Sequence, residues 1–150
     1  MSRAMILAAV GAACLTATVS IAKKYTDYTP QKGLWEVNAI EVDPNHVDDY
    51  LTGLRKSQVP GFEVMKAHGI IDSYKFLVRN GYNKGAPSVL IMTHFTSAAM
   101  LEPDQARDQM VEKEILAKFS EEEGKVAVAG YEKYRTFVDD GLWSEVTMAK

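Results

Sequence analysis

The histidines are the residues of this chain best suited to acid–base chemistry. They stand at positions 46, 68 and 94, and an imidazole oriented by a carboxylate is a usable general base near neutral pH. His94 is the strongest candidate, because it ends a predicted strand that should run antiparallel to the strand carrying Glu36 and Asn38. This arrangement predicts a catalytic group of His94, Glu36 and Asn38. The alternative is a partly buried histidine that only satisfies a neighbouring polar group.

The other two histidines suit structural roles better. His68 precedes Gly69 at a predicted helix end, where a cation and free carbonyl groups attract each other. His46 begins a predicted helix among three aspartates whose spacing matches neither a calcium loop nor a zinc site. The sequence contains no HExxH, GxSxG, GxGxxG or phosphate-loop motif. We therefore expect no bound metal and no cofactor.

Tyrosines form a second set of candidate functional residues. Four of them stand at helical or strand spacing and would add hydroxyl groups to an apolar ligand pocket: Tyr50, Tyr74, Tyr131 and Tyr134. Aromatic side chains at such spacing also build ordinary cores. The four tyrosines are therefore predicted either to bind a small apolar or aromatic ligand or to fill the interior themselves.

Four strands are predicted to position these side chains, over residues 35–42, 70–79, 88–96 and 142–148. A helix pair should separate the first two strands, opening at Asp43-Pro44 and dividing at Pro60. A second pair should follow Ser97, with a capping box of Ser120 and Glu123 and helical spacing continuing to Val138. Residues 125–129 (KVAVA) fit a helix or a strand.

This element order predicts an α+β domain with a ferredoxin-like split βαβ topology. A four-stranded antiparallel sheet with helices on one face leaves its other face open. That face would carry either Trp35, Val37 and Ala39 or Ile40 and Val42, with matching members of the third strand. Both sets are too apolar for water, so we expect this face to pack against a second copy in a homodimer.

In these features the chain resembles the dimeric α/β-barrel superfamily. The resemblance extends from Trp35 to about Met148 and rests on element order, on Asp43-Pro44 after the first strand, and on residues 94–97 (HFTS) closing the third. It implies two sheets paired into a barrel, with a pocket between each sheet and its own helices. Such a family includes cofactor-free monooxygenases, heme-degrading enzymes and small proteins of unknown role.

The resemblance does not extend to heme degradation. That branch uses an asparagine on the first strand, which Asn38 could match, a tryptophan on the third strand, and a histidine on the last helix. Here the third strand has His94 and Phe95 but no tryptophan, and no histidine follows Ser97. Two of three expected residues are missing, which argues against this activity.

The N-terminus is predicted to be a secretory signal peptide, residues 1–22. Arg3 precedes an uncharged run that ends in Ser20-Ile21-Ala22, where Ser20 and Ala22 are the small residues that a signal peptidase requires at −3 and −1. An uncleaved anchor and lipid attachment at Cys14 are the competing interpretations. Cleavage would give a cysteine-free periplasmic or secreted protein with a polar linker over 23–33 and the domain over 34–150.

Composition limits the partners of the cleaved chain. Its 128 residues would carry 16 basic and 20 acidic side chains, a net charge of −4. This charge gives no reason to expect nucleic acid, and the cleaved chain should not insert stably into membranes. The sequence leaves three functions open. The first is a homodimer that binds a small, largely apolar molecule between sheet and helices. The alternatives are a cofactor-independent monooxygenase or isomerase-like enzyme with His94 as base, and a structural or interaction protein without a pocket.

Overall fold

The computed structural model describes residues 21–150. The signal peptide predicted over 1–22, with its alternatives of a lipid on Cys14 or an uncleaved anchor, lies outside the described residues except for its last two. Within 21–150, no helix combines the length and the apolarity needed to cross a membrane.

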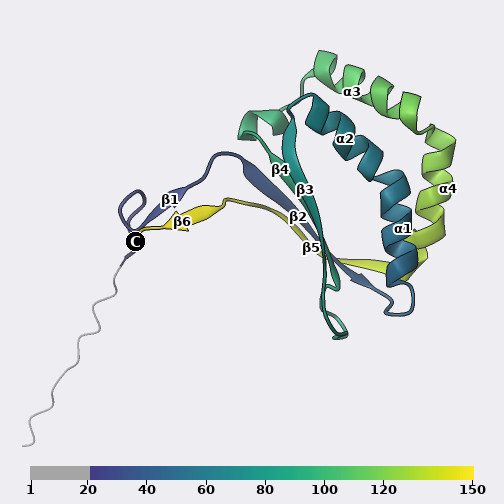
Figure 1. The fold of residues 1–150 in the computed structure, drawn as a ribbon, viewed down its shortest axis with the longest axis horizontal. Helices are drawn as coiled ribbons and strands as arrows, with labels where there is room; N and C mark the ends of the chain where they lie inside the picture. Colours follow the sequence, from purple (N-terminus) through teal and green to yellow (C-terminus); the bar gives the residue numbers. More distant parts are fainter. Residues whose placement is uncertain (1–20) are drawn as a thin grey trace, which may run out of the picture.

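The main sheet has four antiparallel strands in the spatial order β3-β4-β2-β5. Their bounds are β2 Leu34–Val42, β3 Ile71–Val78, β4 Val89–Phe95 and β5 Arg135–Trp143. β3 and β4 form the expected hairpin, whereas β2 and β5 reach their places through helical connections (Figure 1). The α+β class predicted from the sequence is confirmed.

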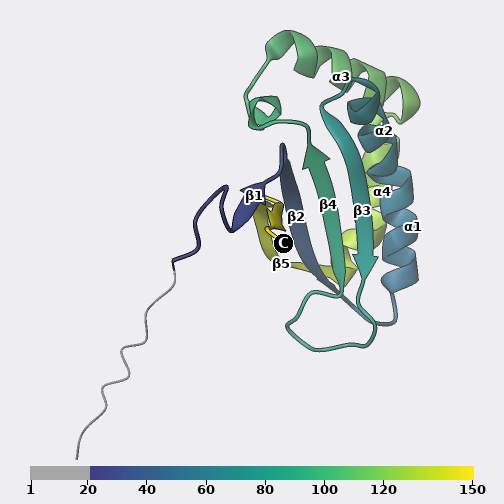
Figure 2. The ribbon, with the colours of Figure 1, turned by 60° about the vertical axis from the view of Figure 1, so that its left-hand side comes forward.

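The helices lie on one side of this sheet (Figures 1 and 2). Two connect β2 to β3, namely α1 Val47–Ser57 and α2 Val59–Ala67. A 3-10 turn at Ala98–Leu101 and two further helices, α3 Gln105–Lys118 and α4 Glu121–Tyr131, connect β4 to β5. The helix pairs also touch each other, with α1 against α4 and α2 against α3.

The sequence predicted side-chain caps at the starts of two helices, and the structure has one of them. The Ser120 side chain accepts a hydrogen bond from the Glu123 backbone, and the Glu123 carboxylate accepts from the Ser120 backbone, so the predicted capping box is present. Asp43 does not cap α1. Its carboxylate accepts from the backbone N–H of Asn45 instead, and the resulting turn delays the helix to Val47.

The helical spacing predicted up to Val138 was wrong beyond Tyr131. α4 ends there, a 3-10 turn covers Glu132–Tyr134, and β5 begins at Arg135. The segment pairs with β2, with Thr136 opposite Glu41. Thr136, Phe137 and Val138 are residue types that favour strands, and the open edge of β2 offered them a partner. Residues 125–129 are helical.

The core lies between the sheet and the helices. Odd-numbered residues of β4 are buried against the helices, as the alternation of Val89, Ile91, Thr93 and Phe95 shows. One buried cluster joins these strands to α1 and α4 through Tyr50, Leu54 and Tyr131 among others, and a second joins them to α2 and α3.

The opposite face of the sheet has no covering element among the described residues. Direct strand partners share a face, and Trp35, Val37 and Ala39 stand opposite His94, Met92 and Leu90. Of the two residue sets that the sequence allowed for this open face, the structure therefore selects the first. Leu77 and Trp143 extend it along the outer strands, with 48% and 58% of their surface exposed.

A small two-stranded arm projects from the body. β1 Tyr28–Pro30 pairs antiparallel with β6 Val146–Met148, so part of the segment predicted as a linker is a strand. Both views place the arm on the side of the main sheet away from the helices (Figures 1 and 2). The strand predicted over 142–148 is thus divided between the end of β5 and the arm.

Candidate functional site

His94 lies at the end of β4 on the open face of the sheet. Its cross-strand partners are Trp35 on β2 and Ser73 on β3. The Trp35 ring packs beside the imidazole, with centroids 4.7 Å apart and planes tilted by 45°. Gly33 packs against its far edge, where a Cβ atom would lie 2.7 Å from Nε2. The imidazole is thus held on two sides, and 14% of the side chain is exposed.

The carboxylate that orients His94 belongs to Asp72. Its Oδ1 lies 2.7 Å from His94 Nδ1 and also accepts a hydrogen bond from the Ser73 hydroxyl at 2.9 Å. The hydrogen bond from His94 holds the pKa of Asp72 below its ordinary value of 3.8, with Ser73 contributing further. Nδ1 therefore donates to the ionised carboxylate, and Nε2 is the ring nitrogen left for another partner.

Glu36 and Asn38 do not join His94. Glu36 stands opposite Thr93 and Asn38 opposite Ile91, so both side chains lie on the helix-facing side of the sheet. The expectation placed Glu36 near His94 correctly along the strand but on the wrong face, because side chains alternate. Asp72 was missed because a β-bulge between Ile71 and Ser73 directs it toward His94.

The remaining histidines also contact carboxylates. His68 Nε2 lies 3.0 Å from Glu114 and so links the end of α2 to α3, and His46 Nδ1, just before α1, lies 2.8 Å from Asp49 in its first turn. His46 also stacks on Tyr134, with ring centroids 3.6 Å apart. These contacts join neighbouring elements. No group of three or more potential metal ligands occurs within residues 21–150.

The four predicted tyrosines do not share one pocket. Tyr50 is fully buried between sheet and helices, and its hydroxyl has no hydrogen-bond partner. Burial raises the pKa of Tyr50, and the nearby Arg135 guanidinium opposes that rise in part. The Tyr74 hydroxyl donates to Glu63 at 2.6 Å, which raises the pKa of Tyr74. Of the four, Tyr131 lines a hollow between two helices of the described surface.

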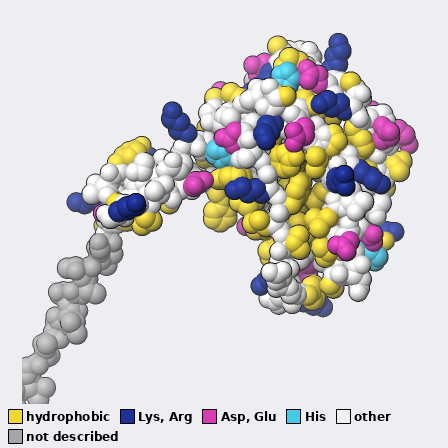
Figure 3. All heavy atoms as spheres, viewed as in Figure 1, with side chains coloured by type: hydrophobic (Ala, Val, Ile, Leu, Met, Phe, Trp, Pro, Cys, Tyr) yellow, Lys and Arg dark blue, Asp and Glu magenta, His cyan; other side chains and the backbone are white. Residues whose placement is uncertain are grey.

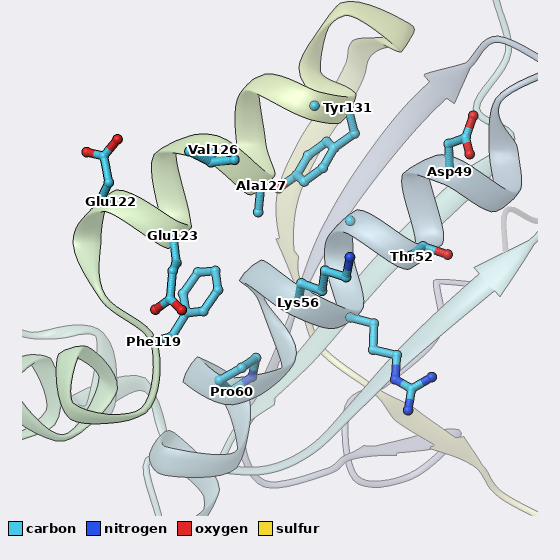
Figure 4. Close-up of a pocket in the computed structure, with 13 residues that line it drawn as sticks. Asp49, Thr52, Lys56, Pro60, Phe119, Glu122, Glu123, Val126, Ala127 and Tyr131 are labelled. Atoms are coloured by element: carbon cyan, nitrogen blue, oxygen red, sulfur yellow. The ribbon is translucent and has the colours of Figure 1, made fainter.

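This hollow is a cleft between α1 and α4, with a volume of about 670 Å³ (Figure 4). Thr52, Gly53 and Lys56 of α1 lie at i, i+1 and i+4, so they present one stripe of that helix to the cleft. The facing stripe of α4 includes Ala127 and Tyr131, which are also four residues apart. The cleft therefore follows from small and apolar residues at helical spacing on two neighbouring helices.

Gly53 allows the two helices to approach. A Cβ atom at this position would overlap Cδ1 of the Tyr131 ring and lie 2.8 Å from its Cε1. The ring is fixed at its other end, because its hydroxyl lies 2.9 Å from the Ser57 hydroxyl. Tyr131 thereby forms a rigid wall at the end of α4, and Pro60 and Phe119 line the other end of the cleft (Figure 4).

Some of the charged groups around the cleft already have a hydrogen-bond or ion-pair partner, and others have none. Glu123 is held in the capping box, whose hydrogen bonds keep its pKa below the ordinary value of 4.5. Asp49 contacts His46. Lys56 forms no ion pair with any residue of the described part, and its side chain reaches into the space between the helices (Figure 4). Its ammonium group is thus available to a ligand.

Sequence reasoning missed the cleft residues other than Tyr131. The available signal was the recurrence of small residues, with Gly53 on α1 and Ala127 and Gly130 on α4. That signal became meaningful only once the two helices were known to be neighbours, because small residues at helical spacing also occur on exposed faces.

Comparisons with known proteins give matches among solved structures. No protein-family model matches the chain, and no curated protein matches it. Among solved structures, the chain is similar to a NipSnap family protein of unknown function from Agrobacterium tumefaciens. The two share 8% sequence identity over 79% of this chain and 88% of that chain, with a TM-score of 0.41. Values this low carry no argument about function.

Proposed function

We propose that this chain is an exported protein that binds a small, largely apolar molecule, and that it works as a homodimer. The observation that carries the binding function is the α1–α4 cleft, whose volume of about 670 Å³ is in the range of small-molecule sites. The ligand position differs from the sequence expectation, since the cleft lies between two helices and not between sheet and helices. Export rests on the predicted signal peptide.

The cleft lining defines the chemical class of the ligand. Pro60, Phe119, Val126 and Ala127 supply apolar contacts, and Val126 leaves 65% of its surface exposed. Lys56 and Arg55 both line the cleft, and neither forms an ion pair within residues 21–150, so both supply a cation without a carboxylate partner. An apolar body with a single anionic group matches this arrangement, because the ammonium can pair with the anion while the apolar part covers Val126 and Ala127.

The homodimer is supported by the open face of the sheet. Val37, Leu90 and Met92 are half-buried on this face, Leu77 and Trp143 are exposed at its outer strands, and no described element covers them. A second copy would bury this surface by face-to-face packing of two sheets. The strand order β3-β4-β2-β5 is that of a ferredoxin-like sheet, which supports pairing in the manner of a dimeric α/β barrel.

Titration with decanoate tests the binding function. Decanoate has an apolar chain and one carboxylate, and isothermal titration calorimetry measures its Kd. Lys56→Met keeps the length of the side chain but removes its charge, so we expect Kd to rise about tenfold. The matched control is Lys113→Met, an exposed lysine on α3 outside the cleft.

The neutral analogue decanol separates charge from apolar contact, because its affinity should be the same in the Lys56→Met variant and the unmodified protein. Absence of decanoate binding, or equal effects of the two lysine variants, would contradict the proposal and favour a structural or interaction protein without a ligand.

A cofactor-independent enzyme of the monooxygenase or isomerase type is the second candidate function. The observation that favours it is the 2.7 Å contact between His94 and Asp72, which fixes the imidazole as a base at Nε2. Nitrogen NMR of the ring distinguishes the two tautomers near pH 7.5. A proton on Nδ1 is expected, whereas a proton on Nε2 would remove this candidate.

A further inference from the structure

The β1–β6 arm is an amphipathic ribbon. Tyr28 stands opposite Met148 and Pro30 opposite Val146, so these four side chains share one face. Thr29 and Thr147 form the other face, which is polar. One side of the arm is therefore apolar and the other suits water.

The apolar face of the arm is partly exposed. Val146 leaves 45% of its surface exposed and Met148 leaves 66%, whereas Tyr28 and Pro30 are half-buried. The arm is attached through its base, where the Trp35 indole donates to Glu145 and the Gln31 amide donates to the Thr147 hydroxyl. An isolated two-stranded ribbon is only marginally stable in water, so a surface that covers its apolar face would stabilise it.

Charge separates the arm from the body. Residues 23–32 and 144–150 carry four lysines and two carboxylates, a net charge of +2, whereas residues 33–143 carry 12 basic and 18 acidic side chains, a net charge of −6. The arm combines exposed hydrophobic and basic side chains (Figure 3). The positive charge and the apolar side chains of the arm therefore complement the negative charge and the exposed apolar sheet face of the body.

A second copy of this chain offers that surface. Leu77 and Trp143 are exposed on its open sheet face, and Asp139 stands on the same face opposite Ala39. The arm projects on the open-face side of its own sheet (Figure 2), which is the side a second copy would approach. A twofold axis makes the contact reciprocal, so each arm would cover the other protomer.

We propose that the β1–β6 arm of each protomer packs with its apolar face on the open sheet face of a second copy, held by Val146 and Met148 and by attraction between arm lysines and the acidic body. This inference rests on the homodimer of the proposed function and adds to it the segment that clasps the partner.

Disulfide trapping between two differently tagged chains tests the contact directly. Both chains begin at Lys23 and so lack Cys14, the one cysteine of the sequence. One carries Met148→Cys and the other Leu77→Cys, and mild oxidation of the mixture should give a disulfide-linked pair containing both tags. The control replaces Met148→Cys by Thr147→Cys, which lies next to it on the polar face, and should give about tenfold less of the mixed pair.

Sedimentation equilibrium measures the contribution of the arm to dimer affinity. Val146→Asp should raise the dimer Kd at least about tenfold, because it places a charge in the proposed contact, whereas Thr147→Asp should leave it unchanged. A dimer with equal Kd for both variants and no mixed disulfide would overturn the arm contact but leave the homodimer intact. A chain that is monomeric at every concentration would overturn both, and the decanoate titration of the cleft would remain a separate test.

Discussion

Gly53 occupies the position where one added methyl group should disturb the α1–α4 cleft most. In Gly53→Ala the new Cβ would overlap Cδ1 of Tyr131 and lie 2.8 and 2.9 Å from two further ring atoms. The ring is 2% exposed and tied to Ser57 by its hydroxyl, so it cannot move without losing packing or a hydrogen bond. Overpacking of this kind costs about 1–3 kcal/mol.

Helix propensity opposes this cost. Alanine is more favourable than glycine within a helix by about 1 kcal/mol, so the net effect of Gly53→Ala should be a loss of up to about 2 kcal/mol in the free energy of unfolding. For a domain of this size that corresponds to a Tm lower by up to about 8 °C. Urea denaturation followed by circular dichroism measures the free energy, and differential scanning calorimetry measures the Tm.

Gly61→Ala is the matched control. Gly61 lies within α2, and a Cβ there would meet only Ile115 Cδ1, at the ordinary distance of 3.7 Å. This variant should gain about 0.5–1 kcal/mol from propensity alone. Opposite signs for the two glycines are therefore the expected result. If Gly53→Ala were as stable as Gly61→Ala, the close packing of Tyr131 on α1 would be refuted.

Three further predictions concern single side chains. Gly33→Ala should destabilise the fold by about 2 kcal/mol or more in urea denaturation, because φ is +80° there and the Cβ would meet a backbone carbonyl and the His94 ring; a change under 0.5 kcal/mol would contradict it. In the same urea denaturation, Tyr50→Phe should leave the free energy of unfolding unchanged or raise it, since the Tyr50 hydroxyl is buried and unpaired. Tyr131→Phe should lower it by about 1 kcal/mol, because the hydrogen bond to Ser57 is lost. Equal losses in the two variants would contradict this contrast. His94→Gln should raise the pKa of Asp72 toward 3.8 in a carboxyl NMR titration, since the His94 hydrogen bond is the main cause of its lowering. Because folding lowers the pKa of Asp72, this carboxylate stabilises the fold above about pH 3.8, and that stability is lost as the pH falls through the folded pKa. An unchanged Asp72 pKa in His94→Gln would contradict the assigned cause.

The sequence predicted those parts of the fold that local signals determine. The apolar run of β4 and the turn residues before it specify the hairpin, and Ser120 with Glu123 specifies the start of α4 through two hydrogen bonds within four residues. The start of β5 was not predictable in the same way. Residues 135–138 acquire their conformation by pairing with β2, which lies almost a hundred residues earlier in the chain.

The candidate site was less predictable than the fold, for a related reason. Which carboxylate meets His94 depends on strand register and on the bulge that directs Asp72, and neither leaves a periodic signal in the sequence. The tyrosines were identified by type, but their separation among different surroundings follows from helix packing. The cleft depends on Gly53 meeting Tyr131 across two helices, a contact between residues 78 positions apart in the sequence.

Methyl NMR with decanoate tests the proposed ligand site most directly. The spectra would follow the methyl groups of Val126 and Ala127 in the cleft and of Leu77 on the open sheet face. We expect saturable shifts at Val126 and Ala127 with Leu77 unchanged, and loss of those shifts in Lys56→Met at the same decanoate concentration. Shifts at Leu77 with unchanged cleft methyls would place the ligand on the sheet and contradict the function proposed for the cleft.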